Sequence, residues 1–244
     1  MDLGLKDKVA LVTAASKGLG YFSALALGLE GAKVIINSSD AGHLAGAASK
    51  LTQLGIEVNA IQGDVTDPSE PSVLINSVLE KYGRIDIVVA NASGPKLASS
   101  MDLTEDEILG AINNNMLSAV RLFKNAMDPM IKNGFGRLIS ISSYSIVQAI
   151  PNLALSNIAR KSLAAWIKTA AYDLRHCHAN VTINTICPGI HLTDRIKELR
   201  SSEANLIAGN PEDFGKAVAF VASTHAGYIN GASLVIDGGE TLNI

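Results

Sequence analysis

Residues 9–20 read Val-Ala-Leu-Val-Thr-Ala-Ala-Ser-Lys-Gly-Leu-Gly. The first four are aliphatic and typical of a buried strand, whereas Gly18 and Gly20 stand where a helical pattern begins. Glycines in a strand-to-helix turn let the backbone approach a pyrophosphate, which the amides at the helix start stabilise. This stretch therefore predicts the opening βα unit of a dinucleotide-binding fold. A tight connection without any ligand is the alternative interpretation.

Strand-like and helix-like segments alternate along the rest of the chain. Runs rich in Val, Ile and Leu predict strands at 8–13, 32–37, 57–62, 85–90, 137–142, 181–187 and 233–236. Helical spacing predicts helices at 18–30, 40–54, 68–82, 105–132, 153–175 and 211–222. Strands that are apolar throughout are expected where both faces of a parallel sheet are covered. The prediction is an α/β protein with a doubly wound parallel sheet (a Rossmann fold), forming a single domain over residues 1–244.

The composition excludes several classes of protein. With 48% apolar and 18% charged residues among 244, the chain is not intrinsically disordered. A net charge of −3 lacks the basic excess that a nucleic-acid or membrane-surface partner requires, and no apolar stretch is long enough to span a bilayer. Two cysteines, Cys177 and Cys187, cannot form a disulfide framework. We therefore expect a cytoplasmic protein with neither kind of partner.

One cluster, His176-Cys177-His178, is a candidate for metal binding. Successive residues of a helix point in different directions, and no second pair of ligands lies nearby in the sequence. A group that interacts with the last carbonyls of a helix is the better interpretation, and no metal site is expected.

Further motifs follow the first loop in a fixed order. Thr13, Gly18 and Gly20 fit the pattern Thr-Gly-x-x-x-Gly-x-Gly, with Ala14 at its first glycine. The later motifs are Asp64-Val65, Asn91-Ala92-Ser93-Gly94, Asn115, Ser142-Ser143, Pro188-Gly189-Ile190 with Thr193, and Asp237-Gly238-Gly239. In this order they resemble the short-chain dehydrogenase/reductase family over nearly the whole chain, in particular members of the 3-oxoacyl-carrier-protein reductase type.

This resemblance implies hydride transfer between a nicotinamide cofactor and a carbonyl/alcohol substrate. It assigns cofactor contacts to Thr13, Ser16, Lys17, Gly18, Leu19, Gly20, Asn37, Ser38, Ser39, Asp64, Val65, Asn91, Ala92, Ser93, Pro188, Gly189, Ile190 and Thr193. The family prefers glycine where this chain has Ala14 and Ser93, so extra bulk is expected beside the cofactor. For Asp64, capping of the following turn is the alternative role.

The residues after the second strand bear on the choice of cofactor. NAD enzymes usually carry an acid near this position, and Asp40 fits the spacing but is better interpreted as the N-cap of the next helix. Asn37 and Ser38 are uncharged and can donate hydrogen bonds to a 2′-phosphate, and Lys17 adds a cation. We therefore expect NADP as the preferred cofactor, with NAD as the alternative.

The expected catalytic positions depart from the family pattern. Ser143 and Asn115 are retained, but the position thirteen residues after Ser143, where the family has its tyrosine, holds Ser156. The lysine position four residues further on holds Arg160. A serine hydroxyl is a much weaker acid than a phenol, and a guanidinium does not release a proton at neutral pH. The resemblance therefore implies an atypical proton donor.

Three replacements for that donor are open. Tyr144 follows Ser143 directly, and His191 follows Ile190 and carries an imidazole, a common proton donor in catalysis. Alternatively, Ser156 hydrogen-bonds the carbonyl while Arg160 stabilises its developing negative charge. A catalytically silent nucleotide-binding sensor or partner subunit is the competing interpretation of the whole chain.

The expectations for the substrate class and for the oligomeric state rest on the resemblance alone. The segment between Thr193 and Pro211, which covers the substrate in the family, looks short and implies an open pocket. Such a pocket suits a carrier-tethered 3-oxoacyl thioester or a small-molecule polyol. Helices of the kind expected at 105–132 and 153–175 pair across a two-fold axis in the family, so a homodimer or homotetramer is expected.

Overall fold

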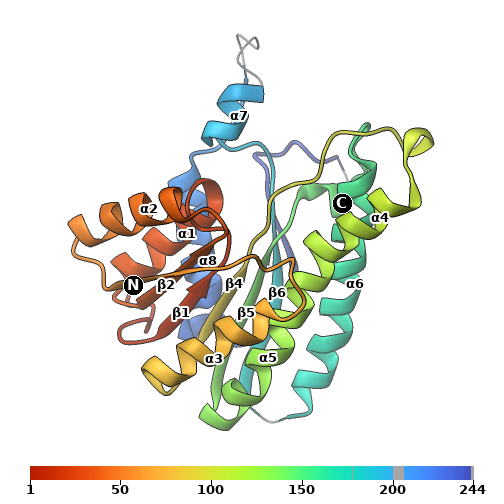
Figure 1. Ribbon diagram of the computed structural model, residues 1–244. Helices are drawn as coiled ribbons and strands as arrows, with labels where there is room; N and C mark the ends of the chain where they lie inside the picture. The colour runs from red at the N-terminus through yellow and green to blue at the C-terminus, as the bar shows by residue number, and fades with distance from the viewer. Residues whose placement is uncertain (178, 200–205, 243–244) are drawn as a thin grey trace.

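A parallel sheet of seven strands runs through the centre of the molecule, in the order β3-β2-β1-β4-β5-β6-β7 (Figure 1). The computed structural model describes residues 1–177, 179–199 and 206–242. The strands are β1 (Val9–Val12), β2 (Lys33–Ser38), β3 (Val58–Gln62), β4 (Ile87–Ala90), β5 (Phe135–Ile141), β6 (Asn180–Pro188) and β7 (Ser233–Ile236). Every predicted strand is present, with ends that differ by at most two residues. The predicted doubly wound parallel sheet is confirmed.

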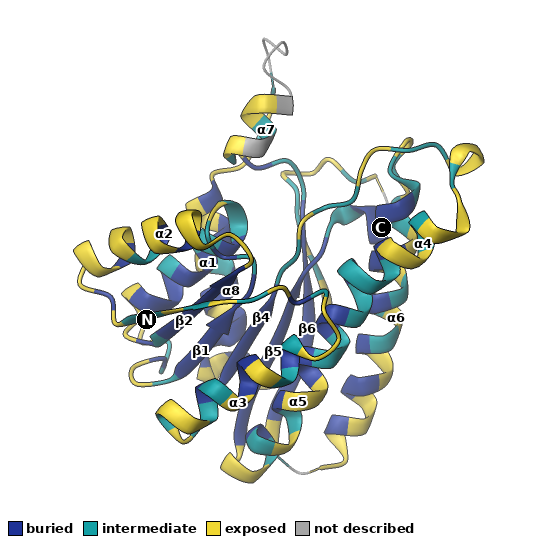
Figure 2. Ribbon diagram, viewed as in Figure 1, coloured by how far each residue is buried: buried dark blue, intermediate teal, exposed yellow. Residues whose placement is uncertain are grey.

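Helices cover both faces of this sheet. They are α1 (Gly18–Leu29), α2 (Ala41–Gln53), α3 (Glu70–Tyr82), α4 (Glu105–Ile112), α5 (Ser118–Asn133), α6 (Ala154–Arg175), α7 (Asp194–Leu199) and α8 (Pro211–Ala222). Helices α1, α2 and α8 pack on one face, and α3, α5 and α6 pack on the other. The inner strands β2, β1, β4, β5 and β6 are largely buried, whereas the edge strands β3 and β7 and the outer helix surfaces are partly exposed (Figure 2).

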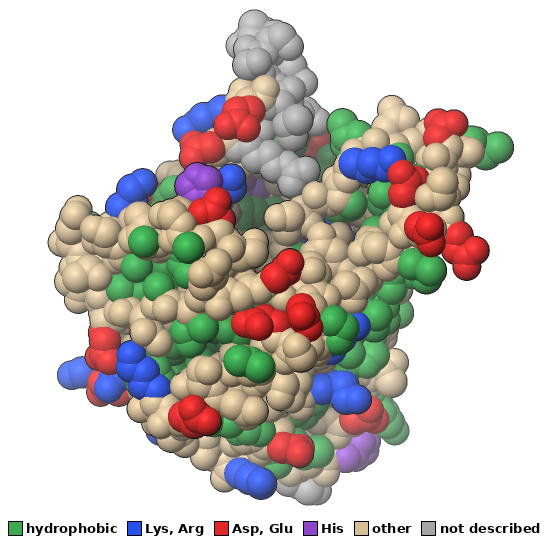
Figure 3. Space-filling view, in the orientation of Figure 1, with side chains coloured by type: hydrophobic (Ala, Val, Ile, Leu, Met, Phe, Trp, Pro, Cys, Tyr) green, Lys and Arg blue, Asp and Glu red, His purple; other side chains and the backbone are tan. Residues whose placement is uncertain are grey.

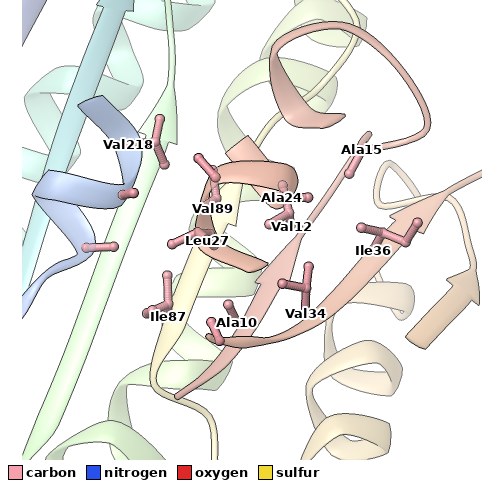
Figure 4. Packing of buried hydrophobic residues seen from close by; sticks show 14 of the residues in the cluster. Ala10, Val12, Ala15, Ala24, Leu27, Val34, Ile36, Ile87, Val89 and Val218 are labelled. Atoms are coloured by element: carbon pink, nitrogen blue, oxygen red, sulfur yellow. The ribbon is translucent and has the colours of Figure 1, made fainter. Parts of the chain in front are cut away.

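The continuous apolar character of β1 follows from this double covering. Ala10 and Val12 point into the core beneath α1, where Leu27 packs against them (Figure 4). Val9 and Leu11 belong to the core on the opposite face. Because successive side chains of a strand point to opposite faces, a strand with a core on each side must be apolar at every position.

The predicted helix at 105–132 is interrupted, which corrects that prediction. Residues Asn113–Leu117 form a π-helical turn between α4 and α5, and the Ser118 amide reaches back to the Asn113 carbonyl. This wider turn carries Asn115 into the interior, where it is buried. Such turns occur often at functional sites, and helical periodicity in the sequence does not reveal them.

A buried arginine ties the amino ends of the strands together. Arg137 of β5 is fully buried and donates hydrogen bonds to the carbonyls of Ser223, Gly136 and Asn180 at 3.0, 2.8 and 2.9 Å. Burial lowers the pKa of Arg137 to about 10, so its guanidinium keeps its charge at neutral pH. The Phe135 ring lies 4.4 Å from the guanidinium carbon. This side chain therefore links β5, β6 and the end of α8.

Replacing Arg137 with Met should lower the free energy of unfolding by about 2–4 kcal/mol, because three carbonyls, two of them in buried hydrogen bonds, lose their donor. Urea unfolding followed by circular dichroism measures the change. The control is Lys132→Met at the exposed end of α5, which is expected to shift the value by less than about 0.5 kcal/mol. Equal effects of the two substitutions would contradict this role of Arg137.

Candidate functional site

The loops that follow the strands form one cleft at the carboxyl ends of the sheet. Its volume is about 670 Å³, and its walls come mainly from the ends of β1 to β6 and the segments that follow them. In a doubly wound sheet this is the crevice where ligands bind, because the chain winds in opposite directions from β1. Lys and Arg side chains are interspersed with Asp and Glu on the face shown in Figure 3.

Most of the predicted cofactor residues line this cleft. They are Ser16, Lys17, Gly18, Leu19, Asn37, Ser38, Ser39, Asp64, Val65, Asn91, Ala92, Ser93, Pro188, Gly189 and Thr193. Thr13, Gly20 and Ile190 do not line it. The residues His43, Thr66, Asn114, Ile141, Ser142, Asp194 and Ile196 line it without having been predicted. Except for Asn114, they lie at a strand end or in the segment that follows one, so those loop positions carried the missing signal. Asn114 belongs to the π-helical turn, which the sequence pattern did not reveal.

The turn after β1 is wound tightly around its small residues. Ala14 has φ = +46° and Gly18 has φ = +61°, both in the left-handed region. A Cβ on Gly20 would lie 2.6 Å from the Ala14 carbonyl oxygen and 2.8 Å from Asn91 Nδ2, so only glycine fits there. The left-handed conformation at position 14 explains the preference for glycine in the resembling family, since an alanine is strained there.

Replacing Ala14 with Gly should raise the free energy of unfolding by about 1 kcal/mol through relief of this strain. Thermal and urea unfolding measure the change. Ala15→Gly is the matched control, because Ala15 is buried in an ordinary conformation and should lose stability when its methyl group is removed. Destabilisation by Ala14→Gly would contradict the assignment of strain.

Thr13 holds the base of the cleft together and does not face it. Its hydroxyl donates to the Asn91 carbonyl at 2.8 Å and accepts from the Asn91 amide at 3.0 Å. The side chain is fully buried between the ends of β1 and β4. The structure thus assigns Thr13 a structural role where a cofactor contact was expected.

Thr13→Val, which keeps the shape but removes both hydrogen bonds, should lower the free energy of unfolding by about 2–3 kcal/mol. Thr13→Ser keeps the hydroxyl and should restore most of that loss. Chemical unfolding of the three proteins distinguishes the hydrogen bonds from the packing of the methyl group. If Ser and Val variants are equally destabilised, the hydroxyl is not the stabilising group.

The start of α1 is suited to an anion. The helix begins at Gly18, and within the described residues no side chain caps it and no acid lies in its first turn. Its first amides therefore point toward the cleft without an internal partner, and the helix dipole favours negative charge at this place. With Gly18 and Gly20 allowing close approach, these residues fit the pyrophosphate of a dinucleotide.

The far end of the cleft is lined by the residues after β2. Both amide hydrogens of Asn37 are used inside the protein, since Nδ2 donates to the carbonyls of Ile61 and Gly63, each at 3.1 Å. The expectation that Asn37 donates to a 2′-phosphate is therefore wrong. Ser38 Oγ lies 3.1 Å from Ser16 Oγ, so these hydroxyls hold each other at the cleft wall.

The two acids of this region both cap local structure. Asp40 accepts from the His43 amide at 2.8 Å as the N-cap of α2, as predicted, and this hydrogen bond lowers the pKa of its carboxyl. Asp64 accepts from the Thr66 amide at 3.0 Å and from the Thr66 hydroxyl at 2.8 Å. The capping alternative for Asp64 is thus confirmed, although both acids also line the cleft.

Asn115 projects from the π turn toward a second, much smaller cavity. Its Nδ2 donates to the Ser93 carbonyl at 2.9 Å, whereas its buried Oδ1 has no partner in the described part of the chain. This cavity of about 10 Å³ is also lined by Thr13, Asn91 and Arg160, and it offers space for roughly one water molecule.

The remaining catalytic candidates come from the loop after β5 and from the first turns of α6. Ser143 Oγ accepts from the Ser145 amide at 3.1 Å, and the Tyr144 hydroxyl donates to Glu240 Oε1 at 2.8 Å. Ser156 and Arg160 are both buried on α6, and Arg160 Nη1 donates to the Ile141 carbonyl at 3.1 Å. Of this group, Arg160 lines the large cleft, but Ser143, Tyr144 and Ser156 do not.

His191 lines the same cleft from the side of α8. Its ring is buried, packs edge-on against Phe214 at 5.3 Å between centroids, and has Nδ1 at 3.1 Å from the Gly189 carbonyl. If Nδ1 carries the proton, this hydrogen bond leaves Nε2 as the acceptor. The neighbouring segment between Thr193 and Pro211 includes residues 200–205, which lie outside the described residues.

Two further expectations bear on the described parts of the chain. Over residues 1–177, 179–199 and 206–242, no group of His, Cys, Asp and Glu side chains is arranged to hold a metal. His178, from the cluster considered above, lies outside those ranges. None of the described helices combines the length and apolar character that crossing a bilayer needs.

The comparisons with known proteins agree with this geometry. The model of the family described as enoyl-(acyl carrier protein) reductase matches residues 13–241. Tropinone reductase-like 3 of Erythroxylum coca is 31% identical, covering 96% of this chain and 93% of its own. 3-Oxoacyl-(acyl-carrier-protein) reductase FabG of Vibrio cholerae is 31% identical, covering 97% and 98% respectively. The chain belongs to the short-chain dehydrogenase/reductase family of oxidoreductases.

Solved structures show the same likeness. L-sorbose reductase from Gluconobacter frateurii, complexed with NADPH and L-sorbose, superposes with a TM-score of 0.92 at 26% identity and 100% coverage of both chains. A 7α-hydroxysteroid dehydrogenase complexed with NADH and 7-oxoglycochenodeoxycholic acid gives a TM-score of 0.91 at 27% identity, covering 99% of this chain and 98% of that one. The similarity to these structures extends over nearly the whole chain, including the sheet and the helices on both of its faces.

Proposed function

We propose that this protein transfers hydride between NADP and a carbonyl/alcohol substrate. The observation that carries the proposal is the cleft at the carboxyl ends of the strands, whose lining includes most of the residues that the family resemblance assigns to the cofactor. The uncapped start of α1 fits a pyrophosphate. The nicotinamide supplies or accepts the hydride when it is bound.

The preference for NADP is supported by the charges at the far end of the cleft. Lys17 is exposed, lines the cleft and offers a cation to a 2′-phosphate, while Asp40 is engaged as a helix cap. Among the structural relatives, the sorbose reductase is complexed with NADPH and the hydroxysteroid dehydrogenase with NADH. NAD therefore remains the alternative cofactor.

The proposed substrate is a small or carrier-tethered carbonyl compound. The FabG relative acts on a 3-oxoacyl group of an acyl carrier protein by name, and the sorbose reductase is complexed with a sugar. The same relatives leave both substrate classes open. For the assembly we propose a homodimer or homotetramer, which the exposed apolar side chains Leu109 of α4 and Ile158 of α6 support.

The proton chemistry of this proposal differs from that of the family. Ser156 and Arg160 are proposed to occupy the places of the family's tyrosine and lysine. Ser156 cannot act as an efficient acid, so its role is to hydrogen-bond the substrate oxygen together with Ser143. Arg160 lines the cleft and stabilises the negative charge that develops on that oxygen.

Tyr144 is the proposed proton donor. It directly follows Ser143, and its phenol hydroxyl donates a hydrogen bond to the Glu240 carboxylate at 2.8 Å. After the phenol has given its proton to the substrate oxygen, Glu240, which is exposed, can return a proton from solvent. His191 is the weaker candidate because its Nδ1 lies against a carbonyl and its ring is packed on Phe214.

The test measures nicotinamide absorbance with NADPH and NADH over a panel of ketones, sugars and 3-oxoacyl thioesters. Tyr144→Phe should lower kcat by roughly 10²–10⁴-fold and leave the Kd for NADP unchanged, because only the proton is lost. Tyr82→Phe on α3 is the control and should keep full activity. Glu240→Gln, which keeps an acceptor for the phenol, should lose far less than Tyr144→Phe.

If His191→Asn lowers kcat strongly while Tyr144→Phe keeps a normal kcat, the proton donor is His191 and not Tyr144. A loss of NADP binding in Tyr144→Phe would contradict the separation of the two roles.

A catalytically silent cofactor sensor or partner subunit is the second candidate, favoured by the position of Ser143, Tyr144 and Ser156 outside the lining of the cleft. Ser156→Tyr distinguishes the candidates. If the natural protein binds NADP but turns over no substrate, and only Ser156→Tyr is active, the silent role is correct.

A further inference from the structure

Another cavity, distinct from the cleft and from the small cavity at Asn115, lies at the amino ends of the strands, at the other end of the sheet from the cleft. Its volume is about 440 Å³, which is in the range of small-molecule sites. It exists because β7 pairs with β6 only from Thr185 onward, opposite Ser233. The first residues of β6 therefore have α6 and the loop before β7 beside them instead of a strand.

The walls of this cavity are fixed by hydrogen bonds that replace strand pairing. Asn230 Oδ1 accepts from the Ile183 amide at 3.0 Å, and Asn230 Nδ2 donates to the Ala171 carbonyl of α6 at 2.9 Å. The Gly231 amide donates to the Ile183 carbonyl at 2.8 Å. A site whose walls are already fixed loses little freedom when a ligand binds.

The charges around the cavity favour an anion. Lys168 and Arg175 of α6 both line it, and no Asp or Glu belongs to its described lining. The two residues lie two helical turns apart and so share one face of α6. Lys168 Nζ donates to the Gly231 carbonyl at 3.2 Å, which holds its charge at the cavity edge. Neither cation forms an ion pair with any described carboxylate.

Two tyrosine rings supply flat apolar surface at the same place. Tyr172 is 65% exposed and Tyr228 is fully exposed, although both line the cavity. The Tyr172 ring is held edge-on against His176 with centroids 4.9 Å apart. Exposed aromatic rings with a fixed orientation offer faces on which a second ring can stack.

Two buried polar groups, one in the cavity wall and one behind it, have no partner among the described residues. Thr182 lines the cavity, is 3% exposed, and its hydroxyl is unpaired. Arg137 Nη2 is also unpaired, and a Cβ on Gly227, in the cavity wall, would lie 3.6 Å from it. Buried donors are nearly always satisfied in folded proteins, so these two indicate a place that a ligand or water completes.

We propose that this cavity is a binding site for a small aromatic carboxylate. Lys168 and Arg175 hold the carboxylate of the ligand, and the Thr182 hydroxyl donates a hydrogen bond to the same carboxylate. The aromatic ring of the ligand stacks on Tyr172. The site is separate from the cofactor cleft and does not rest on the proposed oxidoreductase activity.

Isothermal titration calorimetry of the full chain with 2-naphthoate tests this. The expected Kd is about 0.1–1 mM, given the modest size of the ligand. The neutral analogue 2-naphthalenemethanol should bind at least ~10-fold more weakly, because it lacks the charge that the two cations recognise. Arg175→Gln should weaken the binding of 2-naphthoate to a similar degree. Lys50→Gln on the exposed face of α2 is the control and should leave the Kd for 2-naphthoate unchanged.

Thr182→Val is the second variant, since it keeps the shape of the side chain in β6 while removing the hydroxyl. It should fold normally and bind 2-naphthoate several-fold more weakly. No binding heat at 10 mM, equal binding of the neutral analogue, or unchanged binding in Arg175→Gln would overturn the proposal.

Two further outcomes would also overturn it. Displacement of 2-naphthoate by saturating NADP would mean that the probe occupies the cofactor cleft. Dimerisation in sedimentation velocity that Tyr228→Ser abolishes would mean that a second copy of the chain covers the cavity.

Discussion

The position of β1 between β2 and β4 is the constraint on which the site depends. β1 pairs in parallel with both neighbours. The chain leaves β1 for β2 over one face through α1, and it reaches β4 from β3 over the other face through α3. The loops at their carboxyl ends therefore diverge and leave a crevice between them. Thr13 and Asn91 close the floor of this crevice with their paired hydrogen bonds. The order of the strands creates the cleft, and the loop residues supply the polar and charged groups that line it.

The strands and most helices could be predicted because their causes are local. A strand such as β1 is apolar at every position, and Asp40 stands directly before a helical pattern that it caps. The π turn at Asn113–Leu117 could not be predicted in this way. Its extra residue fits α4 against α6, where Ala111 meets Leu155 and Ala159, and that fit depends on residues far away in the sequence.

The candidate site was predictable where position alone fixes a role. Loop residues such as Ser16 and Val65 line the cleft because they follow a strand. Residues whose polar atoms are used by other parts of the chain were misjudged, as with Thr13 and Asn37, since their partners come from separate loops. The contact between Tyr144 and Glu240 joins segments nearly a hundred residues apart, and no local pattern announces it.

The π turn also limits how this part of the chain can change in length. An α-helix advances about 100° per residue, so losing one residue from this turn would rotate α4 by that angle against α5. Ala111 would then leave its contact with α6, and Asn115 would no longer point to Ser93. Exposed loops usually absorb a deletion, but here the number of residues is itself the requirement. Among natural variants of this chain, substitutions in 113–117 should be far more common than changes in its length.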